Sequence, residues 1–345
     1  LEELPGGVFA ASDALGWVYQ YWQSSRKDAI NNSGVKIGAQ ELPAVTQLFT
    51  EPYMVSFLLD NALGAWWACR VLSEYDFTSA SSETELRRKA AREGVPLDYL
   101  RFVRTDAGTW EPAAGRFAEW PKALADLRVI DPSCGSGHFL VALFQMLVAM
   151  RCAHEGLTAR EACDAVLREN LHGLELDARC VELAVFALAL TAWTTPDAGG
   201  YRELPPLQIA CVGRSPSASR DEWQKRAKGD PNLRGALQMM YDEFRQAPVL
   251  GSLLNPVRTF ADKTFFANWS KVEPSLRAAL AQEDGSVEDH ELGLAAQGLL
   301  QATTLLTSKY HWVVTNVPYL ARGKQCPELA IHCEEQYPEA KSDLA

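Results

Sequence analysis

Three short stretches of the sequence combine residues that could bind a ligand or act on one. The first, Asp131-Pro-Ser-Cys-Gly-Ser-Gly137, follows the apolar residues 129 and 130 and precedes an amphipathic helix expected at residues 139–153. A strand, a glycine turn and a helix in this order let a nucleotide-like ligand lie against bare backbone at the end of the strand. Many α/β proteins use such a turn only to bend the chain. The candidate ligand-binding residues here are Asp131, Pro132, Cys134, Gly135 and Gly137.

The second stretch, Leu171-His-Gly-Leu-Glu-Leu-Asp177, reads as a strand that ends in two acids. Glu175, with Asp177 beside it, suits the hydroxyls of a ribose. Glu175 follows Asp131 by 44 positions, whereas about 20 are expected for a dinucleotide site. The phosphate loop Gly-x-x-x-x-Gly-Lys-Ser/Thr is also absent. A ligand with a ribose but no phosphate fits better, and we predict S-adenosyl-L-methionine as the cofactor.

The third stretch, Asn316-Val317-Pro318-Tyr319, follows an expected strand at residues 310–315. The lone pair of an exocyclic amine is delocalised into its ring, which hinders methylation of that nitrogen. Two acceptors that hold the amine hydrogens can pull the nitrogen toward a tetrahedral shape and aim its lone pair at a methyl donor. The amide oxygen of Asn316 and the backbone carbonyl of Val317 could be these acceptors. Pro318 stiffens the turn, and the ring of Tyr319 could stack on a flipped base. The alternative is an ordinary strand-to-loop turn, because Asn and Pro are common in turns.

The elements expected around these stretches alternate between strands and helices. Strands are expected at residues 129–131, 171–177, 207–213 and 310–315, and helices at residues 139–153, 158–169 and 181–193. This alternation predicts an α/β fold with a doubly wound, mostly parallel sheet. Ligands bind at the carboxyl ends of the strands in such a sheet, so the three stretches should meet there.

A further candidate lies near the amino-terminal end, where Thr50-Glu-Pro52 precedes an expected helix. Thr50 is a plausible N-cap, and Pro52 is tolerated in a first helical turn. The amino-terminal end of this helix could hold a carboxylate. An ordinary capped helix is the alternative.

The sequence predicts five successive regions. Their expected contents are, in order, a helical segment at residues 1–70, a spacer or small subdomain with a strand pair at 71–120, a cofactor-binding core at 121–213, a large helical insertion at 214–305 and a catalytic strand with its loop at 306–345. The stretch 214–305 is too long for an ordinary connection, so we expect it to have structure of its own.

Composition limits the class of protein. The chain has 345 residues, 47% of them apolar, and lacks an apolar run near the ~20 residues that span a bilayer. Its eight cysteines contain no Cys-x-x-Cys pair and its six histidines show no ligand spacing. We therefore expect a cytoplasmic protein with reduced thiols, no metal site and no membrane contact. The net charge of −11 is unfavourable for gripping DNA, although a small basic groove remains compatible with it.

Together the motifs resemble the adenine-N6 DNA methyltransferases. The sequence looks most like the large PglX-like methylases of BREX phage defence and their relatives in DISARM and type IIG restriction–modification. That family carries, in this order, motifs similar to four found here: Gln-Leu-Phe-Thr-Glu-Pro at residues 47–52, Asp-Pro-Ser-Cys-Gly-Ser-Gly-His-Phe at 131–139, Gly-Leu-Glu-Leu-Asp at 173–177 and Asn-Val-Pro-Tyr-Leu-Ala-Arg-Gly-Lys at 316–324.

The resemblance implies a class I methyltransferase fold and a set of residue roles. Phe49 and Thr50 would contact the amino-acid end of the cofactor, the glycine turn its methionine portion, and Glu175 its ribose. Two departures stand out. Val317 replaces a proline but acts through its backbone carbonyl, and Gly213-Arg214-Ser215 lacks the acid or amide that often contacts the adenine of the cofactor.

The resemblance also implies double-stranded DNA as the substrate, contacted largely by regions outside this chain, with defence-system subunits as possible partners. The expectation is therefore the catalytic region of a longer enzyme, and a poor methylase on its own. Two alternatives stay open: a protein glutamine methyltransferase, and a non-catalytic subunit of a defence complex that keeps the fold.

Overall fold

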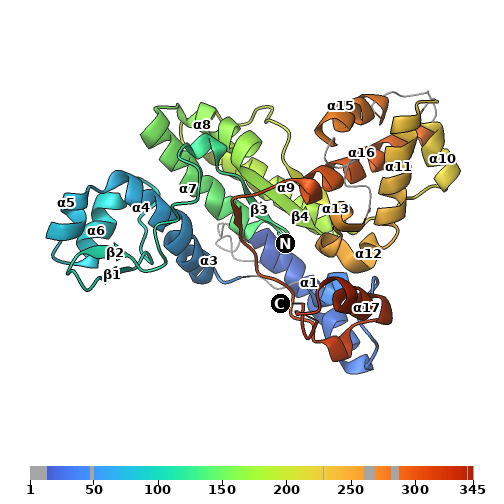
Figure 1. Ribbon diagram of the computed structural model, residues 1–345, viewed down its shortest axis with the longest axis horizontal. Helices are drawn as coiled ribbons and strands as arrows, with labels where there is room; N and C mark the ends of the chain where they lie inside the picture. The colour runs from blue at the N-terminus through green and yellow to red at the C-terminus, as the bar shows by residue number, and fades with distance from the viewer. Residues whose placement is uncertain are drawn as a thin grey trace, which may run out of the picture.

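A four-stranded parallel sheet forms the centre of the molecule (Figure 1). The computed structural model describes residues 14–46, 50–227, 229–259, 269–280, 287–339 and 341–344. The strands lie in the order β5-β4-β3-β6 and neighbouring strands are parallel. Their bounds are β3 (Val129–Asp131), β4 (Leu171–Glu175), β5 (Ile209–Cys211) and β6 (Trp312–Val313). The expected α/β fold with a parallel sheet is confirmed.

Helices cover both faces of this sheet, because successive strand residues point to opposite sides. On one face Val129, Leu171 and Ile209 share a core with α7 (His138–Glu155) and α9 (Ala178–Thr194). On the other face Ile130, Leu174 and Ala210 belong to a second core, to which α16 (Val287–Thr307) contributes. The last helix of the expected insertion thus also covers the sheet. Between α7 and β4 the chain forms α8 (Ala159–Ala165) and the π-helical turn η4 (Val166–Asn170).

Residues 71–120, the expected spacer, form a small helical unit with one hairpin together with the helices that precede them, at the left of Figure 1. Strand β1 (Phe102–Arg104) pairs antiparallel with β2 (Trp110–Pro112), which confirms the expected strand pair. The helical elements of this part of the chain are α3 (Pro52–Leu59), η2 (Asp60–Gly64), α4 (Ala65–Val71), α5 (Glu74–Ser79) and α6 (Glu83–Ala90), and η3 (Leu124–Asp126) leads from it into β3.

The rest of the insertion forms a separate group of helices at the right of Figure 1. Helices α11 and α15 share the second core with α16, so the group is anchored to the sheet. The bounds are α10 (Arg220–Lys225), α11 (Pro231–Phe244), α12 (Ala247–Leu250), η5 (Gly251–Leu253), α13 (Pro256–Thr259) and α15 (Trp269–Leu280).

The two ends of the described chain lie side by side. Figure 1 shows α17 (Pro327–Gln336) next to α1 (Ala14–Ser33) and α2 (Leu42–Val45). The N–H of Ile37 donates to the carbonyl of Lys324 (2.7 Å), and the N–H of Cys326 donates to the carbonyl of Ile37 (2.9 Å). The turn η6 (Arg322–Lys324) lies between β6 and α17. The chain that leaves β6 is therefore tied to the amino-terminal helices.

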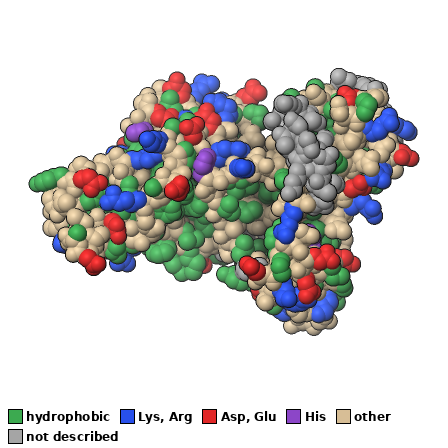
Figure 2. Space-filling view, viewed as in Figure 1, with side chains coloured by type: hydrophobic (Ala, Val, Ile, Leu, Met, Phe, Trp, Pro, Cys, Tyr) green, Lys and Arg blue, Asp and Glu red, His purple; other side chains and the backbone are tan. Residues whose placement is uncertain are grey.

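Acidic and basic side chains are interspersed on the face shown in Figure 2, and hydrophobic side chains gather near its centre. No continuous basic stripe is visible on this face. Among the described helices, none is long and apolar enough to cross a membrane.

A buried amide fixes the entry into β3, and its removal should destabilise the fold. Asn170 is fully buried and its Nδ2 donates to the carbonyls of Leu124 (2.8 Å) and Leu127 (2.7 Å). Asn170→Ala leaves both carbonyls without this donor, so we expect the free energy of unfolding to fall by about 2–4 kcal/mol. Urea denaturation measures this loss. Asn32→Ala, at an exposed site in α1, should change it by less than about 0.5 kcal/mol, and equal effects of the two changes would contradict the assignment.

Candidate functional site

The site lies where the strand order of the sheet reverses. From β3 the chain steps to β4 and then to β5 on one side, and it returns to pair β6 with β3 on the other side. The loops after β3 and β6 therefore diverge at one edge of the sheet, where open α/β sheets bind their ligands. The glycine turn and Asn316 follow these two strands. The sheet thus brings together two of the stretches that the sequence singles out.

The glycine turn brings bare backbone to this edge. Gly137 is the N-cap of α7 with φ +91°, and a Cβ at this position would lie 3.1 Å from the Cβ of Ala184 in α9. Only glycine meets both the left-handed conformation and the close helix packing. Gly135 also has a positive φ, +54°, but a Cβ there would meet no atom within 4 Å. The backbone of Gly135 therefore borders open space that a ligand can enter.

The Glu175 carboxylate joins the ends of β3 and β4. Its Oε2 accepts from the N–H of Gly135 (2.8 Å) and its Oε1 from the N–H of Asp177 (2.9 Å). Burial raises the pKa of Glu175, and the backbone N–H groups of Asp177, Gly135 and Leu176 oppose that rise. A carboxylate has about four acceptor positions, so some acceptor capacity remains. Glu175 is therefore held in place and can still accept hydrogen bonds from a ligand.

Asp131 and Cys134 lie behind the surface of the site. Asp131 is 1% exposed and its Oδ1 accepts from the N–H of Ser133 (3.0 Å). Burial raises the pKa of Asp131 to about 7. The N–H of Cys134 donates to the carbonyl of Leu174 (2.9 Å), which ties the turn to β4. In the described structure both residues shape the glycine turn from within.

Asp177 is occupied by contacts within the protein. It is the N-cap of α9, and its Oδ2 accepts from the hydroxyl of Tyr19 (2.6 Å) and forms an ion pair with Arg179 (3.0 Å). Burial acts to raise the pKa of Asp177, but hydrogen bonds from Arg179 and Tyr19 outweigh it and lower the pKa. Asp177 thus connects α1 to α9, while Glu175, two positions earlier, borders the pocket.

Thr50 contacts the candidate catalytic amide. The Nδ2 of Asn316 donates to the Oγ1 of Thr50 (3.1 Å). The prediction that Thr50 caps α3 is wrong: Glu51 is the N-cap and makes no side-chain capping bond, while Pro52 opens the first turn as expected. The hydroxyl of Thr50 is directed to Asn316 instead. Phe49 lies outside the described residues.

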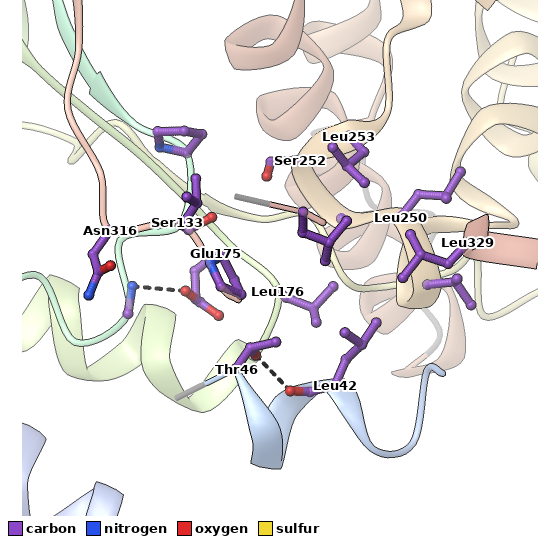
Figure 3. A pocket seen from close by; sticks show the side chains of 17 residues that line it. Leu42, Thr46, Ser133, Glu175, Leu176, Leu250, Ser252, Leu253, Asn316 and Leu329 are labelled. Carbon is purple, nitrogen blue, oxygen red and sulfur yellow. Dashed lines mark hydrogen bonds between the residues drawn. The ribbon is translucent and has the colours of Figure 1, made fainter. Parts of the chain in front are cut away.

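A pocket contains six of the predicted site residues in its lining (Figure 3). Pro132, Gly135 and Glu175 come from the first two strand ends, and residues 316–318 come from the third. Tyr319 is 70% exposed and is not part of the lining. The remaining lining residues are Leu42, Thr46, Ser133, Leu176, Val249, Leu250, Gly251, Ser252, Leu253, Leu329 and Leu344.

Most of these additional residues carried no sequence signal. Leu176 stands between Glu175 and Asp177, so its place in the motif could have marked it. Leu250 and Leu253 are far from every motif in the sequence, and they reach the pocket only because the insertion folds back onto the ends of β4 and β5. Leu42 and Leu329 arrive through the pairing of the amino-terminal helices with α17.

Within the part of the chain that the structure describes, no group of three or more His, Cys, Asp or Glu side chains could hold a metal ion. The eight cysteines, all of them described, are free thiols.

Comparison with known proteins gives a consistent picture. A family model described as the DNA-methyltransferase domain of MmeI matches residues 110–227. The adenine-specific methyltransferase PglX of Lacticaseibacillus casei is 29% identical over 336 residues, which cover 96% of this chain and 26% of the relative. The adenine-specific methyltransferase BrxX of Escherichia coli is 25% identical over 361 aligned residues, which cover 100% of this chain and 28% of the relative.

A second PglX, from Streptomyces coelicolor, is 30% identical over 132 residues. The chain spans about a quarter of the length of the first two relatives. Over nearly its whole length the chain is similar to PglX-like adenine-specific methyltransferases.

Proposed function

We propose that this chain carries the catalytic region of an enzyme that transfers a methyl group from S-adenosyl-L-methionine to the N6 amine of a flipped adenine in DNA. The observation that carries the proposal is the convergence of Gly135, Glu175 and Asn316 on one pocket at the point where the strand order reverses. In this proposal the parallel sheet is part of a doubly wound class I methyltransferase fold. The biological setting would be restriction–modification or phage defence, as the resemblance of the motifs suggests.

The residues of the pocket fit this cofactor. The Glu175 oxygens have remaining capacity for the two hydroxyls of a ribose, and the open space beside Gly135 admits an aliphatic chain. The buried acids Asp131 and Glu175 favour a positively charged ligand over a phosphate. When bound, the cofactor would supply an electrophilic methyl group on a sulfonium sulfur.

Asn316 would then prepare the acceptor nitrogen. Its Nδ2 is used by Thr50, which leaves Oδ1 to accept one amine hydrogen, and the Val317 carbonyl can accept the other. Two acceptors pull the nitrogen toward a tetrahedral shape and direct its lone pair at the methyl carbon. The methylated nitrogen is acidic, so its proton can leave to water without a strong base. The exposed ring of Tyr319 offers a stacking surface for the base.

Double-stranded DNA is the proposed substrate, and the charge of this chain bears on how it would be held. With 44 acidic and 33 basic residues, the chain lacks the excess of positive charge that backbone binding needs. We therefore propose that this chain carries out the chemistry on the base, and that most phosphate contacts are made elsewhere in the complete enzyme.

Removing the amide of Asn316 should abolish methyl transfer. In an assay of the complete enzyme with labelled S-adenosyl-L-methionine and adenine-containing DNA, we expect Asn316→Ala to lower kcat by about 10²–10³-fold, because one preorganised acceptor is lost. Asn32→Ala should leave kcat unchanged. Label that enters protein rather than DNA would favour a glutamine methyltransferase, and an Asn316→Ala variant with full activity would contradict the proposed role of the amide.

The hydrogen bond from Asn316 to Thr50 makes Thr50 a positioning residue. Thr50→Val keeps the shape but removes the acceptor, so we expect kcat for DNA methylation to fall about tenfold while the KM for S-adenosyl-L-methionine changes by less than about twofold. Thr50→Ser restores the hydroxyl and should recover most of the rate. A raised cofactor KM with unchanged kcat would instead mean that Thr50 binds the cofactor directly.

A further inference from the structure

One turn of the helical insertion lies against the end of β4. The turn, residues 249–253, consists of the end of α12 and the whole of η5, and Gly251 has φ +51°. A Cβ at Gly251 would lie 2.9 Å from Cδ1 of Leu176 and 3.9 Å from Cγ2 of Val212. This contact requires glycine both for its backbone conformation and for the space. The turn is thus closely packed against residues that directly follow β4 and β5.

The pocket is divided into a polar and an apolar half. Figure 3 shows Asn316 on one side of Glu175 and Leu250, Leu253 and Leu329 on the other. Leu176 lies between the carboxylate and this apolar group. A ligand that occupies the whole pocket would meet a hydrogen-bonding amide, then a carboxylate, then a leucine-lined surface.

This order of chemical groups along the pocket fits a nucleoside. A ribose at Glu175 that directs its 5′ substituent toward Asn316 places its base on the opposite side, against the leucines. The flat face of a purine is apolar, so its transfer from water to such a surface is favourable. Ser252, which also lines the pocket, offers a hydroxyl to the polar edge of the base.

We infer that residues 249–253 of the insertion form the wall that binds the nucleobase of the methyl donor. The inference rests on the proposed function, since it takes the ligand of Glu175 to be the ribose of S-adenosyl-L-methionine. It gives the insertion a role in the site and replaces the polar contact that Gly213-Arg214-Ser215 does not provide. Leu253 is the best residue for a test because it is only partly buried, so a change there should leave the fold intact.

The test compares one substitution at two positions of the insertion. Leu253→Asn places an amide in the pocket, whereas Leu294→Asn makes the same change at a site in α16 that is 55% exposed and outside the pocket lining. Isothermal calorimetry on the 345-residue chain measures binding of S-adenosylhomocysteine and of 5′-methylthioadenosine, which lacks the amino-acid end. We expect Leu253→Asn to raise both Kd values by about tenfold, and Leu294→Asn to leave both within about twofold of the wild-type values.

A volume-conserving change provides the second control. Leu253→Met keeps an apolar surface and should bind both ligands with affinity close to wild type. The inference is overturned if Leu253→Asn binds both ligands as wild type does, or if only S-adenosylhomocysteine is weakened, since that would place the amino-acid end at the turn. Failure of the wild-type chain to bind either ligand would instead overturn the proposed function, and the inference with it.

Discussion

The Glu175 carboxylate holds the site together. Its two oxygens accept from the N–H of Gly135, in the turn after β3, and from the N–H of Asp177, after β4. Two loops from neighbouring strands are thereby fixed to one buried charge. A buried carboxylate is costly unless it is hydrogen-bonded, and these bonds reduce that cost while the pocket side stays available. Other features of the site depend on this arrangement, because it sets where the glycine turn lies relative to the end of β4.

The pocket is closed by segments that contribute nothing to the sheet. Leu42 and Leu329 come from the paired amino-terminal helices and α17, and Leu250 and Leu253 come from the insertion. These segments are far apart in the sequence and meet around the ends of β4 and β5. The sheet therefore positions the polar groups, and the added segments determine the shape and the apolar character of the space beside them.

The sequence predicts which residues meet at the site where those residues directly follow a strand. Glu175 and Asn316 each follow an apolar run, and parallel strands end at one edge, so their meeting could be predicted. The contact between Thr50 and Asn316 could not, because it depends on how α3 approaches β6 across 266 positions of chain. The position of turn 249–253 at the pocket could not be predicted either, because leucines near a glycine and a proline are typical of any packed loop. Its place is set by long-range packing against Leu176 rather than by local pattern.

The charge around the pocket favours one class of ligand. Asp131 and Glu175 are both almost fully buried, and burial raises the pKa of each. The charge of Glu175 raises the pKa of Asp131 further, and the charge of Asp177 raises that of Glu175. A phosphate brought to this edge would be repelled by the same charges. A ligand with a sulfonium and an ammonium group would lower the cost of keeping both carboxylates ionised. The buried acids beside the glycine turn thus favour a cationic methyl donor as the ligand.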